Sequence, residues 1–108
     1  MAKRAESYKS DVAKKLRSPK FANDYMQALI YNHETSFKEA LAEMIDTFGQ
    51  VEFAERSAIK ASNVSRLVDR LRSDENIKEE TLERLLNVFG LTLTIGTRVV
   101  DPRELKGA

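Results

Sequence analysis

A short stretch of the chain gathers side chains of the types that read DNA. Lys60, Ser62, Asn63, Ser65 and Arg66 fall within one segment of the sequence. Arginine can donate two hydrogen bonds to guanine O6 and N7, asparagine can pair in the same way with adenine, and serine can contact base edges. A basic side chain beside them can bind a phosphate oxygen. This combination predicts contacts in a DNA major groove.

These side chains can reach base edges only from the start of a helix that a second helix holds against the DNA. Val64 and Leu67 repeat with a helical period, and the small Ala54 suits the point where a preceding short helix would cross. Residues 58–60 would form the tight turn between the two helices. The sequence therefore predicts a helix-turn-helix over residues 50–72. Its inward-pointing side chains would be Phe53, Ile59, Val64 and Leu67.

The candidate DNA-binding residues share an expected exposed position on this motif, and they are Gln50, Lys60, Ala61, Ser62, Asn63, Ser65, Arg66 and Arg70. Gln50 is expected to contact a phosphate, and Ser62, Asn63 and Arg66 to contact base edges. Arg70 and Arg72 either contact phosphates or pair with nearby acidic residues, namely Asp69, Asp74 and Glu75. Lys14, Lys15 and Lys20 either form a solvated face or touch flanking DNA or an acidic partner.

Charge is distributed unevenly along the chain, although the net charge is only +1. Residues 1–20 carry seven basic and two acidic residues, residues 21–58 carry two basic and seven acidic, and residues 59–73 carry four basic and one acidic. Attraction to phosphate acts over roughly 8–10 Å at physiological salt, so a local basic patch is sufficient for binding DNA. The alternative is that these blocks are solvated helix faces.

Helical periods and capping signals predict four further helices. Tyr8, Val12 and Leu16 mark a helix over about residues 4–17, and Ser18 with Pro19 would start the next one. Ser36 and Glu39 have capping-box spacing at the start of a helix that Gly49 would end with a left-handed cap. The last helix contains Leu82, Leu85, Leu86 and Phe89 and would stop at Gly90.

After Gly90 the apolar period changes to two, because Leu91, Leu93 and Ile95 alternate with threonines. This pattern predicts a half-buried strand, which needs a partner for its unpaired edge. Gly96 and Thr97 could form a two-residue turn that lets residues 98–100 pair back as a hairpin. Alternatively, the strand pairs with its copy in a second subunit.

Several classes of function lack their sequence signals. The 108 residues fit one domain, contain no cysteine, and include no apolar run long enough to span a membrane. No glycine-rich phosphate loop, metal cluster or catalytic set is visible, and the single histidine, His33, is expected in a surface loop. We therefore expect a cytoplasmic protein that is not an enzyme and needs no metal or other cofactor.

The segment from Gln50 to Leu67 resembles the helix-turn-helix of the phage-repressor (Xre-like) family. Gln50 stands at the family's opening glutamine, Phe53-Ala54 at its Leu-Ala pair, and Ser65-Arg66-Leu67 at the end of its signature. Ala58 replaces the usual turn glycine, which should cost about 1 kcal/mol if that residue is left-handed. Lys60 stands where a serine cap is common, so Ser62 could cap the helix instead.

The flanks are similar to addiction-module antidote proteins, both in the opening segment over residues 16–29 and in the ending Phe89-Gly90-Leu91-Thr92-Leu93. This resemblance covers about residues 12–95. It implies an antitoxin of a type II toxin–antitoxin pair that represses its own operon, with a small RelE-like ribonuclease as the usual toxin. A homodimer on a palindromic operator in double-stranded DNA is then expected.

The predicted fold is mainly α: a lambda-repressor-like bundle of five to six helices with a helical extension before it and a short strand after it. Residues 1–34 would form the extension, residues 35–96 the helix-turn-helix domain with its strand, and residues 97–108 a tail. Two other functions stay open. One is a stand-alone phage-type repressor, and the other is a toxin-neutralising interaction module with weak DNA binding.

Overall fold

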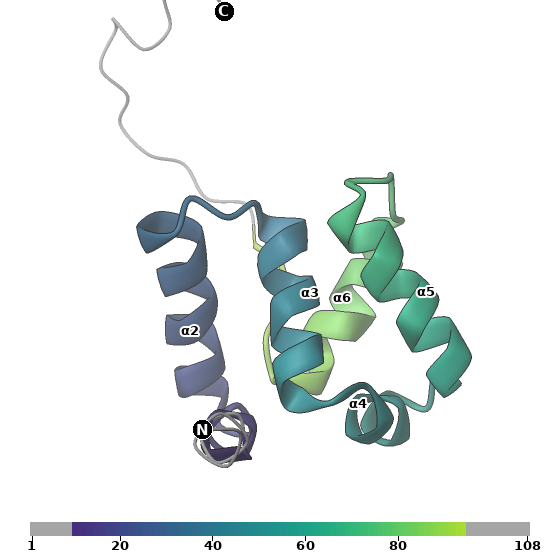
Figure 1. The fold of residues 1–108 in the computed structure, drawn as a ribbon, viewed down its shortest axis with the longest axis horizontal. Helices are drawn as coiled ribbons and strands as arrows, with labels where there is room; N and C mark the ends of the chain where they lie inside the picture. Colours follow the sequence, from purple (N-terminus) through teal and green to yellow (C-terminus); the bar gives the residue numbers. More distant parts are fainter. Residues whose placement is uncertain (1–9, 95–108) are drawn as a thin grey trace, which may run out of the picture.

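The computed structural model describes residues 10–94, and within them the chain is mainly helical, as the sequence predicts (Figure 1). Residues 10–15 are helical and are followed by five longer helices. These are α2 (Pro19–Asn32), α3 (Phe37–Phe48), α4 (Gln50–Ser57), α5 (Ala61–Arg72) and α6 (Glu79–Val88). Figure 1 shows α3 between α2 and α5, α4 across one end, and α6 behind.

The core is built around α3, which is buried on more of its circumference than the other helices. Its buried side chains are Ala40, Leu41, Ala42, Met44, Ile45 and Phe48. They meet Val64, Val68 and Leu71 from one stripe of α5 and Leu85 and Leu86 from α6. A helix placed centrally must be apolar on several sides, whereas a surface helix needs only one stripe. This is why α5 can leave a whole face polar.

The N-terminal part of the chain contributes to the same core. Val12 and Leu16 from the helical residues 10–15 and the turn after them are buried, as are Ala22 and Met26 from α2. Ser18 stands at the N-cap of α2 and Pro19 at its first position, but the serine side chain makes no capping hydrogen bond. The division of the chain at residue 34 stays a prediction.

Two of the helix ends follow from local chemistry. The Ser36 hydroxyl accepts a hydrogen bond from the Glu39 N–H at 3.2 Å, as its capping-box spacing predicts. The left-handed cap predicted at Gly49 is wrong, because its φ of 106° is joined to a ψ of 120°. Gly49 instead bends the chain directly from α3 into α4. Its N–H donates to the Ile45 carbonyl, and its own carbonyl accepts from Phe53 N–H.

The strand predicted to begin at Leu91 is not found in residues 91–94, which are the part of that segment that the structure describes. Within residues 10–94 there is no neighbouring strand to pair with, and a glutamate of α6 takes that role. Glu83 accepts hydrogen bonds from the Thr92 hydroxyl and from the Leu93 N–H. These bonds, the hydroxyl first, lower the pKa of Glu83 below its ordinary value. Ile95, the Gly96–Thr97 turn and residues 97–108 lie outside the described residues.

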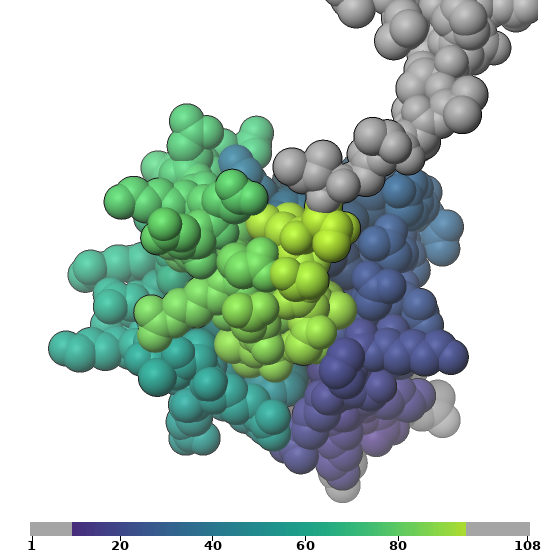
Figure 2. Space-filling view, turned by 180° about the vertical axis from the view of Figure 1, so that it is seen from behind, coloured from purple at the N-terminus to yellow at the C-terminus, as the bar shows by residue number. Residues whose placement is uncertain are grey.

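The alternation that suggested a strand is present as alternating burial. Leu91 and Leu93 are half-buried against the core, whereas Thr92 and Thr94 are exposed. Figure 2 shows this yellow end of the described chain lying between the blue surface of α2 and the green surface of the later helices. Among residues 10–94, no helix combines the length and apolarity that crossing a membrane requires.

Gly90 lets residues 91–94 return along α2. It has a φ of 75°, and a Cβ atom built on it would lie 2.6 Å from Pro19 Cγ. We predict that Gly90→Ala lowers the free energy of unfolding by about 1–3 kcal/mol, from left-handed strain plus overpacking. Urea denaturation measures the change.

A double-mutant cycle separates these two causes. In a Pro19→Ala background the Cγ atom is gone, so Gly90→Ala should cost less there than in the wild type, by at least about 0.5 kcal/mol. Equal costs in both backgrounds would show that the contact with Pro19 Cγ does not restrict residue 90.

Candidate nucleic-acid interface

Two helices of the bundle, α4 and α5, are joined by only three residues, 58–60. The predicted inward positions are confirmed: Phe53 and Val64 are fully buried, and Ile59 and Leu67 are half-buried against the core. Ala54 is buried as well, which allows the two helices to approach closely. The pair is therefore packed into the bundle along one side, and the opposite side of α5 is left to the surface.

The turn between these helices is left-handed at residue 58, although alanine stands there in place of the usual glycine. Ala58 is left-handed, with φ 59° and ψ 24°. The buried Ser57 hydroxyl supports it by donating to the Ala54 carbonyl at 3.3 Å and accepting from the Ile59 N–H at 3.2 Å. From α6, Arg84 Nη2 donates to the Ser57 carbonyl at 3.1 Å. A serine one residue before the turn signals the local bonds, but the Arg84 contact depends on tertiary packing.

The outward face at the start of α5 carries most of the predicted site. Its members are Lys60, at the N-cap, and the exposed residues Ala61, Ser62, Asn63, Ser65 and Arg66. The alternative of a Ser62 cap is wrong, because Lys60 is the N-cap and its carbonyl accepts the Asn63 and Val64 N–H groups. The side chains of the five polar members form no hydrogen bond or ion pair with any residue in 10–94. They are therefore available to a ligand.

The basic residues at the other end of α5 are already paired. Arg70 Nε lies 3.4 Å from Glu75 Oε2, and Arg70 Nη2 donates to the Asn76 carbonyl, so of the two interpretations of Arg70 the structure shows the ion pair. Arg72 pairs across the bundle with Asp46 at 2.6 Å and Glu43 at 3.3 Å. The expected pairing of Arg72 with Asp69, Asp74 or Glu75 is therefore wrong.

The reason for the Arg72 pairing is position. The end of α5 packs against α3, whose exposed side carries both carboxylates. The hydrogen bond with Asp46 is the largest cause that raises the pKa of Arg72 above its ordinary value. The positive charge of this arginine is thus partly neutralised within the protein.

Gln50, at the first position of α4, is half-buried and also meets Asp46. Its Nε2 donates to Asp46 Oδ1 at 2.7 Å. Asp46 therefore connects the end of α3 with the start of α4 and, through Arg72, with the end of α5. Asp46 is not among the residues predicted from the sequence, although its spacing of four from Gln50 is a local signal.

The basic N-terminal segment contacts α4, the first helix of the pair. Arg17 Nη2 lies 2.7 Å from Glu52 Oε1, and Arg56 Nε lies 3.5 Å from the same oxygen. Lys14 and Lys20 are exposed, while Lys15 Nζ lies 5.9 Å from the centre of the Phe21 ring. The N-terminal basic patch thus adjoins the helix pair on the α4 side.

Other chemistry has no arranged site among residues 10–94. No group of three or more histidine, cysteine, aspartate or glutamate side chains is placed to hold a metal ion there. His33 is exposed at the end of α2, as expected. In the part of the chain that the structure describes, the polar face of α5 is the surface whose residue types and lack of internal partners best fit recognition of a ligand.

The left-handed Ala58 yields a prediction about stability. Glycine adopts this conformation without the Cβ strain of roughly 1–2 kcal/mol, although it loses more backbone entropy on folding. We expect Ala58→Gly to raise the free energy of unfolding by about 0.5–1 kcal/mol, which corresponds to a melting temperature several degrees higher.

The matched control for this variant is Ala28→Gly within α2, which should lower stability by about 0.5–1 kcal/mol because glycine weakens a helix interior. Thermal unfolding followed by circular dichroism compares the two. A lower melting temperature for Ala58→Gly than for the wild type would contradict the left-handed turn.

No protein-family model, curated protein or solved structure matches the chain. The interpretation of α4 and α5 therefore depends on their own geometry and chemistry. The features that carry it are the three-residue connection, the buried Phe53 and Val64, and the uncommitted polar face of α5.

Proposed function

We propose that the protein binds double-stranded DNA sequence-specifically, with α4 and α5 acting as a helix-turn-helix. The observation that carries the proposal is the face of α5 that starts at Lys60 and includes Asn63 and Arg66. It is exposed, basic and polar, and it makes no contact that would occupy it among residues 10–94. A helix with one buried stripe and its free N-terminal half at the surface suits insertion into a major groove.

The residue types suggest distinct roles on the DNA. Arg66 donates to guanine O6 and N7, and Asn63 pairs with adenine, because the spacing of their donors and acceptors matches those base edges. Ser62 and Ser65 are short enough to contact bases where α5 lies deepest. Lys60 binds a phosphate as a flexible point charge.

Two predicted contacts are weaker candidates. Gln50 already donates its amide to Asp46, so a phosphate contact requires its side chain to exchange partners. Arg70 is held by Glu75 and by the Asn76 carbonyl, and it would have to leave both to reach DNA. We therefore assign most of the binding free energy to residues 60–66.

The DNA-binding proposal makes a quantitative prediction. For the DNA upstream of its own gene, the double variant Asn63→Ala/Arg66→Ala should bind at least about tenfold more weakly, since each specific base contact is worth roughly 1–3 kcal/mol. Lys60→Ala should weaken binding to all sequences and reduce the slope of log K against log salt by about one. Fluorescence anisotropy titrations over a range of salt concentrations measure both.

Lys78→Ala is the matched control, because Lys78 is an exposed basic N-cap at the start of α6, away from the start of α5. It should bind DNA like the wild type. Wild-type affinity of the Asn63→Ala/Arg66→Ala variant would exclude α5 as the recognition helix.

We further propose that the DNA-binding protein is an antitoxin that represses its own operon as a homodimer. The resemblance of residues 16–29 and 89–93 to antidote proteins supports this role. The structure adds an aromatic side chain, Tyr31, which is 76% exposed on α2, a helix that α3 separates in the chain from the proposed DNA-binding pair. Tyrosine is enriched in protein interfaces, so α2 is our candidate surface for the toxin.

Co-expression with the product of the adjacent short gene tests the toxin partner. We expect the two proteins to purify together and the ribonuclease activity of the partner to fall, and Tyr31→Ala should weaken the complex. An active ribonuclease in the presence of excess wild-type protein would favour a stand-alone repressor.

A further inference from the structure

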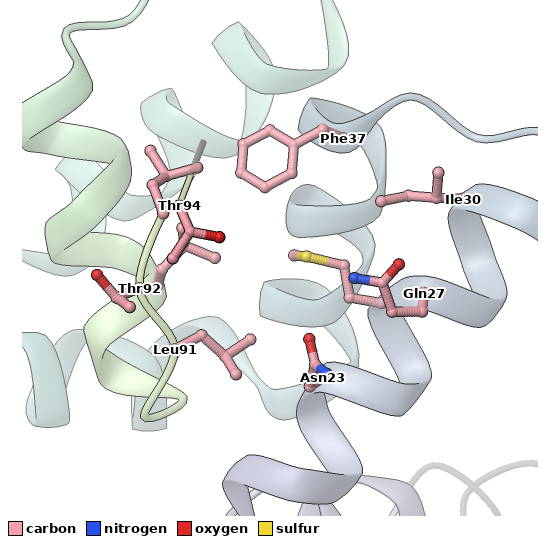
Figure 3. Close-up of a pocket in the computed structure, with 10 residues that line it drawn as sticks. Asn23, Gln27, Ile30, Phe37, Leu91, Thr92 and Thr94 are labelled. Atoms are coloured by element: carbon pink, nitrogen blue, oxygen red, sulfur yellow. The ribbon is translucent and has the colours of Figure 1, made fainter. Parts of the chain in front are cut away.

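A groove of about 200 Å³ lies between α2 and residues 91–94 (Figure 3). Its apolar lining comes from Met26, Ile30, Phe37, Leu86, Leu91 and Leu93, and its polar lining from Asn23, Gln27, Thr92 and Thr94. In Figure 3, Asn23 and Gln27 lie on α2, across the groove from the trace that carries Leu91, Thr92 and Thr94. None of the described residues that line the groove is charged. An uncharged, partly apolar segment is therefore the occupant that it fits.

One wall of this groove is an unpaired backbone edge. Leu91 N–H donates to the Leu86 carbonyl and Leu93 N–H donates to Glu83 Oε2, so both groups point toward α6. Successive residues of an extended chain point their N–H groups to opposite sides. The N–H groups of Thr92 and Thr94 therefore point toward the groove, and neither bonds to another described residue. Such an edge accepts an added strand.

We propose that the occupant is the chain's own segment of residues 99–101, added as an antiparallel strand hydrogen-bonded to Thr92 and Thr94. Fourteen residues, 95–108, follow directly from the wall of the groove. Among them Val99 and Val100 form an uncharged pair of strand-favouring residues, which matches the uncharged lining. A short loop is enough to bring them back beside residues 92–94.

The free edge determines the register of this pairing. Thr94 forms a hydrogen-bonded pair with Val99 across a four-residue loop, and Thr92 forms the next hydrogen-bonded pair with Asp101. Val100 then lies opposite Leu93 and faces the groove with it, whereas Asp101 faces solvent with Thr92. Pro102 follows at a position that donates no hydrogen bond to residues 91–94, so its missing N–H costs nothing there.

Other registers conflict with the residue types. A shift by one residue in either direction puts Asp101 on the apolar side, opposite Leu91 or Leu93, and one of the two shifts also places Pro102 opposite Thr92, which needs its N–H. A two-residue turn at Gly96–Thr97 gives the same residue pairs, but it requires the Leu93 N–H, which is already bonded to Glu83. The sequence therefore supports one register on the edge that the structure leaves free.

Hydrogen exchange of the full-length protein, followed residue by residue by NMR, tests this pairing. We expect the Thr92 and Thr94 amides to exchange at least about tenfold more slowly than in an unstructured peptide. Val100→Asp should abolish this protection, because it places a charge in the uncharged groove. Val99→Asp is the matched control and should leave it unchanged, because Val99 faces solvent. Asp101→Pro removes the N–H that bonds to Thr92 without altering the core, and should also abolish the protection of Thr92.

Three results would overturn the proposal. The first is unprotected Thr92 and Thr94 amides in the wild type, and the second is equal loss of protection in Val99→Asp and Val100→Asp. The third is protection that falls on dilution, which would show that the strand comes from a second copy of the chain. If Val100→Asp unfolds the helices, the surface variant Asp101→Pro decides between pairing and no pairing.

Discussion

Phe53 is the contact on which the placement of the proposed DNA-binding helices depends. Its ring centre lies 6.4 Å from that of Phe48 at the end of α3 and 5.6 Å from that of Phe89 after α6. Phe48 and Phe89 also meet, nearly edge to face, at 5.5 Å. A helix of eight residues such as α4 is not stable alone in water. The contacts among these three rings therefore stabilise α4, because its intrinsic helix propensity is not sufficient. Residues 58–60 connect α4 to α5, so the position of α4 also determines where α5 begins.

Polar contacts also connect α4 and α5 with the rest of the bundle. Asp46 binds Gln50 at the start of α4 and Arg72 at the end of α5, so one carboxylate relates both helices to α3. Arg84 adds a further connection by donating to the carbonyl of Ser57 at the end of α4. Exposed ion pairs contribute little to stability individually. The burial of Phe53, Val64 and Leu71 therefore holds α4 and α5 on the core, and these polar contacts add to it.

The sequence predicts the helices well because their cause is local. Apolar residues at helical spacing place Phe53, Val64 and Leu71 in the core without knowledge of their neighbours. What could not be predicted depends on contacts between distant segments. Arg72 has acidic residues close in sequence, yet it pairs with Asp46 on α3, because only the packing of α3 against α5 brings them together.

The segment after Gly90 fails as a strand prediction for a related reason. Its alternation of leucine and threonine correctly separates the half-buried from the exposed side chains. The hydrogen bonds of a strand, however, depend on which acceptors and donors lie beside it. Here a carboxylate of α6 accepts the hydrogen bond from the Leu93 N–H. A pattern of period two therefore determines which way side chains point, but not which groups the backbone bonds.

The side chains of the candidate site are easier to predict from the sequence than the contacts that support them. Lys60 and Arg66 are exposed and pair with no residue in 10–94, so their residue types carry the information without a tertiary contact there. Leaving two such cations unpaired costs the fold little, because a surface ion pair is worth at most about 1 kcal/mol. Pairing them within the protein would add equally little stability and would cancel the positive charge that a phosphate backbone attracts. Stability thus places no demand on this face of α5, and the arrangement of its side chains is free to serve recognition.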